Sequence, residues 1–429
     1  MDIFEDLEYK RAGQNPKKLS PLAGIITKVS KINKNPKALK VRYFEKLLNF
    51  IRVLCLYIID KNDFIETMKI KNLFKEKGSN NRIVESFVDL LFHFNILGSY
   101  NGEIVFNKKY VRILKSENKL IDKLFKQDIL DKDLKVNGLT KDYLFVKDLI
   151  RKYRDKGYEF QYIKRNKDTW SSMLKDGALD YEVRLAETLH ELSQLDIPNK
   201  IKSPFDEDYY TESGRNAFKN FTQFKFIDVF AETVQNQHNA NVLDIGCGYG
   251  NYIDVLSNNY PMFQIDGIES QENVFEETSR KFKATRNVEI IHGDFFNYRF
   301  RKKYDVVLLN YVLFYFNAYE KSELISKVKE ILTENGSVIV CQYFSGIEDL
   351  KKELANKQKE RSPFKEIEMY YSNKILYANT LWNDTADTFS ESVKWEEFLE
   401  AISKNNLKIN RITNADKFYY SLFIELKAV

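Results

Sequence analysis

Three glycines at alternate positions follow a short apolar stretch in the carboxy-terminal half of the chain. They are Gly246, Gly248 and Gly250, in the segment VLDIGCGYGNY of residues 242–252. Glycine lets a chain turn tightly and lets a bound molecule approach the backbone, because it has no Cβ atom. Asp244, at the end of the apolar stretch, can accept hydrogen bonds from an ammonium group or from water. The spacing therefore predicts a strand that runs into a ligand-binding turn just before a helix.

Two more groups of residues with suitable chemistry follow the next two expected strands. Glu269 comes about twenty residues after the glycines, where a carboxylate can hold both hydroxyls of a ribose. Asp294 and Phe295 follow the third expected strand and offer a carboxylate for an exocyclic amine and an aromatic ring beside a purine. A glycine motif alone is weak evidence, so the order and spacing of all three groups carry the prediction of a nucleoside-binding site.

The glycine segment differs from that of dinucleotide-binding Rossmann domains, in which the third glycine more often stands inside the helix. DIGCGYG instead resembles the first motif of the class I S-adenosylmethionine-dependent methyltransferases. This resemblance implies that S-adenosylmethionine is the cofactor and that no metal is needed. It also implies that Asp244, the three glycines, Glu269, Asp294 and Phe295 bind the cofactor.

A longer segment, YDVVLLNYVLFYFNAYEKSELISKVKEILTENGSVIV, is similar to the region from the fourth to the fifth strand of two-domain small-molecule O-methyltransferases. In that family the amino-terminal part is a winged-helix dimerisation domain. The resemblance covers about residues 45–429 and is motif-specific only within about 241–341. It implies that Asn310 and Tyr311 flank the adenine, although a strand end packed against its neighbouring helix explains the same residues.

Plant members of that family use an adjacent His-Asp pair as the general base that deprotonates a phenol. Aligned without gaps, this pair falls on Phe314 and Tyr315. The sequence therefore predicts a transfer that uses no imidazole base. N-methylation, C-methylation of an activated carbon, and O-methylation assisted by tyrosine or glutamate remain open. None of the four histidines lies on a segment expected to face the transferred methyl group: His93, His190, His238 and His292.

Candidate groups for the chemical step are Tyr315, Tyr210 and Glu391. The insert between the fifth and sixth strands and the approach to the first helix are rich in aromatic residues, which suits an apolar or aromatic acceptor. Packing of a helical cap onto the sheet explains the same residues equally well. The aromatic residues concerned are Tyr209, Tyr210, Tyr370, Tyr371, Tyr377 and Trp382.

Short β-branched runs alternate with amphipathic helical patterns from residue 241 onwards, which indicates a parallel sheet with crossover helices. Together with the resemblance, this predicts an α/β Rossmann-like methyltransferase domain over residues 201–429, with a seven-stranded, mostly parallel sheet. Pro198, Pro204 and an acidic stretch mark the boundary near residue 200. The runs are NVLDIG, FQIDGIE, VEIIHGD, YDVVLLN and GSVIVCQ.

Residues 1–200 are expected to form a mainly α, winged-helix-like domain that dimerises and caps the substrate. Residues 41–60 are apolar on all sides, which predicts a buried helix. Further on, a helix that starts near Asn80 and ends at Gly98, followed by a short β ribbon, gives the winged-helix order. That helix is mostly apolar, so we expect it to form a structural or dimer contact and not to read DNA.

Hydrophobic residues make up 43% of the chain and charged residues 30%, as in an ordinary globular protein. No apolar run approaches the roughly 18 residues that span a bilayer, and the acidic start lacks the apolar core of a secretory signal. We therefore expect a cytoplasmic protein that does not enter the membrane. The three cysteines lie far apart, which predicts neither a disulfide framework nor a zinc site.

The net charge of +5 is divided unevenly, at about +11 before residue 200 and about −6 after it. This asymmetry leaves two competing functions open. A nucleic-acid methyltransferase is disfavoured because the residues after the fourth strand read NYVL, unlike NPPY or DPPY. A winged-helix regulator with a domain that senses S-adenosylmethionine is disfavoured because the helix that starts near Asn80 is apolar. The leading prediction is a homodimeric methyltransferase with a small-molecule substrate.

Overall fold

The computed structural model describes residues 19–30, single helical residues between 45 and 59, and residues 81–110, 218, 222–358 and 362–429, with residues 101 and 102 excepted. The chain divides into two compact units. The first comprises residues 1–204 and 361–387, and the second comprises residues 205–360 and 388–429. Residues 361–387 therefore belong to the same unit as the amino-terminal half, although the sequence placed them after the boundary near residue 200. The two units are described separately below.

The second unit contains a seven-stranded sheet with the order β5-β4-β3-β6-β7-β9-β8. Strands β5, β4, β3, β6 and β7 are parallel, whereas β9 is antiparallel to both β7 and β8. The predicted α/β Rossmann-like fold is thereby confirmed. The strands are β3 (Asn241–Ile245), β4 (Gln264–Glu269), β5 (Val288–His292), β6 (Tyr304–Asn310), β7 (Leu332–Gln342), β8 (Leu407–Asn414) and β9 (Leu422–Ala428).

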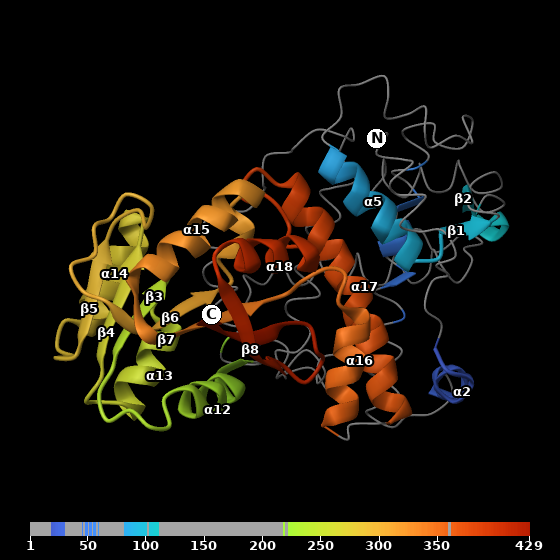
Figure 1. The fold of residues 1–429 in the computed structure, drawn as a ribbon. Coiled ribbons are helices and arrows are strands. Elements are labelled where there is room, and N and C mark those ends of the chain that lie inside the picture. The colour runs from blue at the N-terminus through green and yellow to red at the C-terminus, as the bar shows by residue number, and fades with distance from the viewer. Residues whose placement is uncertain are drawn as a thin grey trace, which may run out of the picture. The chain divides into compact units, whose positions relative to one another are not determined.

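Helices cover both faces of this sheet, because each parallel connection must cross over it. Figure 1 shows α12 and α13 on one side of the strands and α15 on the other. The helices are α12 (Gln223–Thr233), α13 (Asn251–Asn259), α14 (Glu272–Phe282), α15 (Ala318–Ile331), α16 (Glu348–Lys357) and α18 (Trp395–Lys404), with a short 3-10 helix at Leu313–Tyr315.

One apolar cluster fills the space between the sheet and the face formed by α12, α13 and α14. Phe226 and Phe230 of α12 are fully buried in it, and Phe282 contributes the end of α14. The alternate residues Val306 and Leu308 point into the same cluster from β6. Because side chains alternate across a strand, Asn310 lies on this same face at the carboxyl end of β6. The core thus fixes which side chains reach that edge of the sheet.

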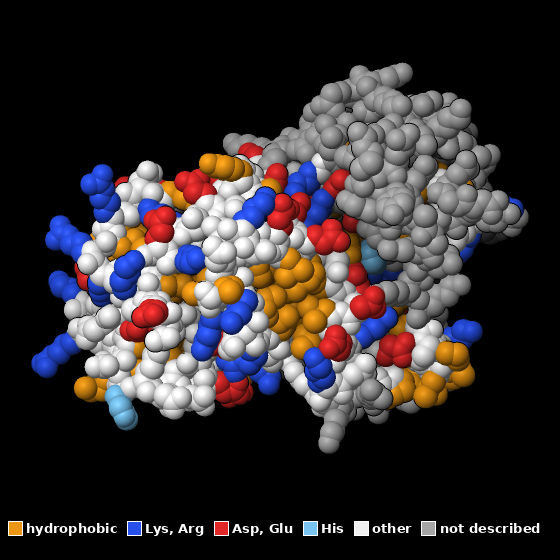
Figure 2. Space-filling model, viewed as in Figure 1, with side chains coloured by type: hydrophobic (Ala, Val, Ile, Leu, Met, Phe, Trp, Pro, Cys, Tyr) orange, Lys and Arg blue, Asp and Glu red, His pale blue; other side chains and the backbone are white. Residues whose placement is uncertain are grey.

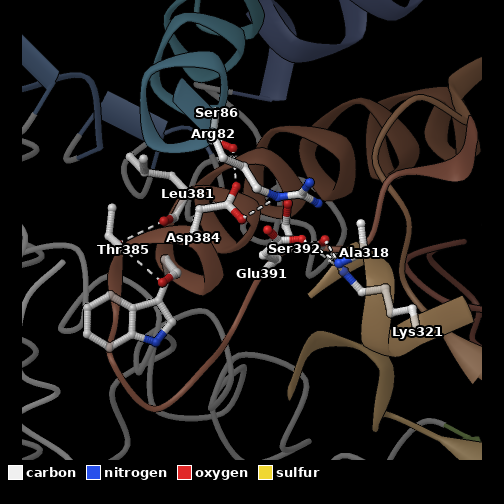
Figure 3. A network of polar contacts seen from close by, with 10 residues as sticks. Arg82, Ser86, Ala318, Lys321, Leu381, Asp384, Thr385, Glu391 and Ser392 are labelled. Atoms are coloured by element: carbon white, nitrogen blue, oxygen red, sulfur yellow. Dashed lines mark hydrogen bonds and ion pairs between the residues drawn. The ribbon is translucent and has the colours of Figure 1, made fainter. Parts of the chain in front are cut away.

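The first unit contains helices α2 (Pro21–Ser30), α5 (Asn81–His93) and α17 (Pro363–Thr385), and the hairpin of β1 (Leu97–Tyr100) and β2 (Glu103–Phe106). A buried ion pair joins two of the helices, since Asp384 of α17 accepts a hydrogen bond from Arg82 Nε at 3.2 Å and another from Ser86 Oγ. Figure 3 shows these contacts between α17 and the first turns of α5. The aspartate side chain is wholly inaccessible to solvent.

The expected order of a helix followed by a β ribbon is present in this unit, with one correction. The helix ends at His93 and not at Gly98, which lies within β1. Asn95 stops the helix earlier because it adopts a left-handed conformation with φ 58°, a common way for a helix to end. The described residues between 45 and 59 are helical and largely buried, as the apolar pattern of residues 41–60 predicts. The part of the expected winged helix that precedes α5, up to residue 80, lies outside the described residues.

In the described part of the chain, none of the helices combines the length and apolar character that crossing a bilayer requires.

Candidate functional site

The glycine loop, residues 246–250, connects β3 to α13 and depends on glycine at each alternate position. Gly246, Gly248 and Gly250 have φ values of 65°, 51° and 67°, in the left-handed region that L-residues with a side chain rarely adopt. A Cβ atom on Gly246 would lie 2.7 Å from Val312 Cγ1, and one on Gly250 would lie 2.4 Å from Phe282 Cε2. All three glycines therefore satisfy a backbone requirement, and Gly246 and Gly250 also satisfy a packing requirement.

Glu269, the last residue of β4, holds the glycine loop from one side. Its Oε2 accepts a hydrogen bond from Gly248 N at 3.0 Å, while Oε1 accepts from Ser270 N at 2.8 Å and Gln271 N at 3.0 Å. The strand-end carboxylate is buried, and three backbone N–H groups donate to it. It stands at the position from which the sequence predicts that it binds a ribose.

Asp244 is buried at the end of β3, and its Oδ2 has no hydrogen-bond partner among the described residues. Burial, with a smaller effect of the nearby Glu269 charge, raises the pKa of Asp244 to about 8. Asn310, at the end of the adjacent strand β6, is 7% exposed, and neither its amide oxygen nor its amide nitrogen has a partner in the described structure. Buried polar atoms without partners are costly, so this place is suited to a ligand that supplies them.

Two hydroxyl groups that the sequence analysis missed belong to the same region. Thr222, just before α12, is 1% exposed and Tyr252 of α13 is 7% exposed, and the two hydroxyls lie close enough to interact with each other. Burial is the main reason that the pKa of Tyr252 lies well above its usual value, and the Asp244 carboxylate adds to the shift. Their only signal in the sequence is a polar atom on an otherwise apolar helix face.

These groups fit the amino-acid end of S-adenosylmethionine, which carries an ammonium and a carboxylate. The ammonium matches the Asp244 carboxylate and the Asn310 amide oxygen. The cofactor carboxylate matches the Asn310 amide nitrogen and the hydroxyls of Thr222 and Tyr252. The fit rests mainly on the unpartnered atoms of Asp244 and Asn310, which alternate with core residues of their strands and so lie on one face of the sheet. Within the described ranges, no group of three or more His, Cys, Asp or Glu side chains is arranged to hold a metal ion.

The residues expected at the purine lie after β5. Asp294 Oδ1 accepts hydrogen bonds from Asn297 N and Nδ2, both at 3.0 Å, so the carboxylate stabilises its own turn. Phe295 is buried, with its ring 5.5 Å from that of Phe300 and with Lys327 Nζ 5.3 Å from its centroid. The roles of Asp294 and Phe295 in binding adenine stay predictions.

Tyr311 follows Asn310 directly and turns away from the strand. Its φ is 55°, its N–H donates to Cys341 O at 2.8 Å, and its hydroxyl lies 2.9 Å from Ser421 Oγ. The backbone of Tyr311 is therefore hydrogen-bonded to β7, and its side chain is hydrogen-bonded to the loop before β9. Whether Asn310 and Tyr311 flank the adenine, as the resemblance implies, stays a prediction.

The two positions that align with the His-Asp pair form the short helix after β6. Phe314 is 8% exposed and contacts Tyr343 and Phe389, with ring centroids 5.7 Å and 5.2 Å away. Tyr315 is 40% exposed, and its ring lies 5.5 Å from that of Phe389. Neither position offers an imidazole.

The histidines that the structure describes lie elsewhere. His238 is exposed before β3, and His292 stacks on Phe275 with ring centroids 4.8 Å apart. His93 belongs to the first unit and stacks on Tyr377 at 3.6 Å. His190 lies outside the described residues.

Glu391 has a role at the start of α15 that its place in the sequence did not reveal. Its Oε2 accepts from Ala318 N at 3.0 Å and lies 3.7 Å from Lys321 Nζ, which also donates to Ser392 O at 3.1 Å. Figure 3 shows these contacts. The carboxylate therefore accepts from the first N–H of a helix and pairs with a lysine that is 5% exposed, so it is already engaged in structural contacts.

The other candidates for the acceptor pocket are divided between two groups. Tyr209 and Tyr210 lie outside the described residues. The aromatic residues of the insert are in α17, which belongs to the first unit, and all except Tyr370 are buried there: Tyr371, Tyr377 and Trp382.

Comparison with known proteins agrees with this geometry. Residues 242–336 match a family described as a methyltransferase domain. An uncharacterised methyltransferase of Alkaliphilus oremlandii is 23% identical over 150 residues, which cover 35% of this chain and 67% of that protein. An (S)-coclaurine N-methyltransferase of Thalictrum flavum is 25% identical over 185 residues, which cover 37% of this chain and 50% of that protein. The chain thus spans between half and two thirds of the length of these relatives.

Among solved structures, an O-methyltransferase family 2 protein of Planctomyces limnophilus, in complex with apigenin, has a similar fold. The TM-score is 0.50 and the identity 13%, with 97% of this chain and 99% of that chain covered. The second unit is accordingly a class I methyltransferase domain whose cofactor is S-adenosylmethionine, as the sequence predicts.

Proposed function

We propose that this chain transfers the methyl group of S-adenosylmethionine to a small, aromatic or apolar acceptor without an imidazole base. The observation that carries the proposal is the pair Phe314 and Tyr315 at the positions of the His-Asp pair. Phe314 is buried against aromatic neighbours and has no atom that accepts a proton. The acceptor must therefore be nucleophilic at neutral pH, which favours an amine, or a carbon beside a carbonyl group.

A continuous group of aromatic rings supports an apolar or planar acceptor. Tyr343 contacts Tyr311, Phe314 and Tyr420, with centroid distances of 6.3 Å, 5.7 Å and 5.4 Å, and Phe389 extends the group beyond Phe314. Tyr311 and Phe314 follow the carboxyl end of β6 and Tyr343 follows that of β7, where open α/β sheets bind their ligands. Such rings offer flat apolar surfaces and exclude water from a reacting centre.

When bound, S-adenosylmethionine supplies an electrophilic methyl carbon on a positively charged sulfur. For an amine acceptor, the nitrogen lone pair forms the new bond to this carbon, the carbon–sulfur bond breaks, and its electron pair stays on sulfur. The methylated ammonium product then releases its proton to solvent. The protein contributes mainly by holding both reactants in line, which accounts for much of the acceleration in such displacements.

The chemical step retains three proposed participants. Tyr315 is more accessible than Glu391, the other candidate that the structure describes, since 40% of the Tyr315 surface is exposed beside the aromatic group. Glu391 is engaged with Ala318 N and Lys321, so its proposed role requires those contacts to open. Tyr210 lies outside the described residues and remains a proposal from the sequence alone. O-methylation assisted by Tyr315 is the alternative to an amine acceptor.

We further propose that the chain forms a homodimer through its first unit. On α2, the apolar side chains of Leu22 and Ile25 are 57% and 56% exposed. Figure 2 shows an apolar patch at this helix. A second copy that covers the patch would remove it from water. Light scattering at micromolar concentration tests the proposal, and a monomer there would contradict it.

A paired-acceptor assay tests the proposed chemistry. The purified chain is supplied with S-adenosylmethionine and either an aromatic amine or the phenol of the same skeleton, over a range of pH. We expect the amine to be methylated in preference to the phenol. Phe314→His, made together with Tyr315→Asp, should raise the rate on the phenol relative to the amine, because it supplies a general base. Preferential methylation of the phenol by the parent, with an inflection near pH 6.5 as for an imidazole, would contradict the proposal.

A further inference from the structure

Thr278 of α14 contacts the glycine loop from behind. Its hydroxyl donates to the carbonyl oxygen of Gly248 at 2.8 Å, and the side chain is 1% exposed. The N–H group of the same residue is also held, because Gly248 N donates to Glu269 Oε2 at 3.0 Å. Gly248 is therefore fixed through both its donor and its acceptor.

The rest of the loop is tied to the same two elements. The N–H groups of Gly246 and Cys247 donate to Ile268 O in β4, at 2.9 Å and 3.2 Å. Lys281 Nζ of α14 approaches Tyr249 O at 3.4 Å. The α14 ring of Phe282 packs directly against Gly250. Segment β4–α14 thus provides the support on which the loop rests.

This support matters because three left-handed glycines in five residues make an isolated loop highly variable in conformation. When only a fraction of the molecules has the loop in its binding conformation, the apparent affinity for the ligand is reduced to that fraction of the intrinsic affinity. The partly buried carbonyl of Gly248 would also lose its hydroxyl donor if Thr278 were changed, and would keep only the long contact from Cys247 Sγ at 3.8 Å.

We propose that Thr278 is a positioning residue for cofactor binding, which keeps the glycine loop in its binding conformation through the Gly248 carbonyl. The residue acts through the backbone of the loop and needs no contact with the cofactor. Its place in the sequence agrees with this role, because Val274, Thr278 and Phe282 are the buried residues of α14 and only the middle one carries a hydroxyl. The proposal rests on the cofactor assignment and is independent of the acceptor.

Two comparisons test this inference, each between two side chains at position 278 of which only one carries a hydroxyl group. Thr278→Val keeps the shape of threonine without the hydroxyl, and Thr278→Ala differs from Thr278→Ser by one oxygen atom. Titration calorimetry of the full chain with S-adenosylhomocysteine should show about a tenfold weaker Kd for the valine variant than for the parent, equivalent to about 1.4 kcal/mol. The alanine variant should bind about tenfold more weakly than the serine variant. Ser279→Ala, which removes a hydroxyl from the next residue of the same helix, is the matched control and should bind as the parent does.

A purely structural role gives a different pattern. In that case, the valine and alanine variants would lower the melting temperature and leave the Kd unchanged, which would overturn the proposal. Equal losses in the serine and alanine variants would also overturn it, because they would assign the effect to the lost methyl group. Steady-state kinetics adds a second readout, since the KM for the cofactor should rise while kcat at saturating cofactor stays near that of the parent. If the parent itself failed to bind S-adenosylhomocysteine, the proposed function would fail, and not this inference alone.

Discussion

Replacement of Gly246 by alanine violates both requirements at this position, the left-handed backbone conformation and the space for a side chain. The fold requires φ 65° at this position, and a residue with a Cβ atom adopts this left-handed conformation at a cost of about 1–2 kcal/mol. It also places Cβ 2.7 Å from Val312 Cγ1, and overpacking of a tight site costs about 1–3 kcal/mol more. We therefore expect a loss of about 2–5 kcal/mol in the free energy of unfolding.

Gly346→Ala is the matched control for this experiment. Gly346 has φ 85° and nothing lies within 4 Å of its added Cβ, so the control experiences backbone strain without the clash. Urea unfolding should show a loss of about 1–2 kcal/mol for Gly346→Ala. Calorimetry with S-adenosylhomocysteine should show at least about tenfold weaker binding for Gly246→Ala and no change for Gly346→Ala. Equal stability losses in both variants, with parental affinity in Gly246→Ala, would refute the reasoning.

The remaining predictions concern charge, the missing base and the packing of the first unit. Burial raises the pKa of Asp244 to about 8, so between about pH 4 and pH 8 the folded chain keeps a proton that the unfolded chain has released. The contribution of Asp244 to the free energy of unfolding therefore falls as the pH rises through this range. Affinity for S-adenosylhomocysteine should instead increase between about pH 6 and 7.5, because the ammonium of the ligand pairs with the ionised carboxylate, and calorimetry of Asp244→Asn should show that this pH dependence has disappeared. His93→Gln, His238→Gln and His292→Gln should each keep single-turnover rates within about tenfold of the parent, whereas a thousandfold loss in any of them would reveal a relocated base. Asp384→Ala should destabilise the first unit by about 3 kcal/mol in chemical unfolding, because Arg82 and Ser86 lose their buried partner, while the exposed Asp387→Ala serves as its control.

The sequence by itself determined the features that depend on residues close together in the chain. Gly246, Gly248 and Gly250 could be recognised because a left-handed turn that begins a helix has few solutions among the amino acids. Glu269 at a strand end and the alternating strands and helices followed from spacing in the same way. The absence of the His-Asp pair could also be read directly, since Phe314 and Tyr315 stand in continuous register with the fourth strand.

Contacts between distant segments were decided only by the tertiary structure. Glu391 looks like a possible base in the sequence, yet it lies 73 residues from the helix start at Ala318 that it caps. Residues 361–387 belong to the amino-terminal unit, and the carboxylate of Asp384 meets Arg82 and Ser86, which lie 302 and 298 residues earlier in the chain. The partner of Thr278 is a backbone carbonyl 30 residues away, and side-chain types carry no information about such a partner. Local geometry restricts residue choice strongly, whereas a hydrogen bond or ion pair across the fold accepts many residue types at many separations, so only the folded chain identifies it.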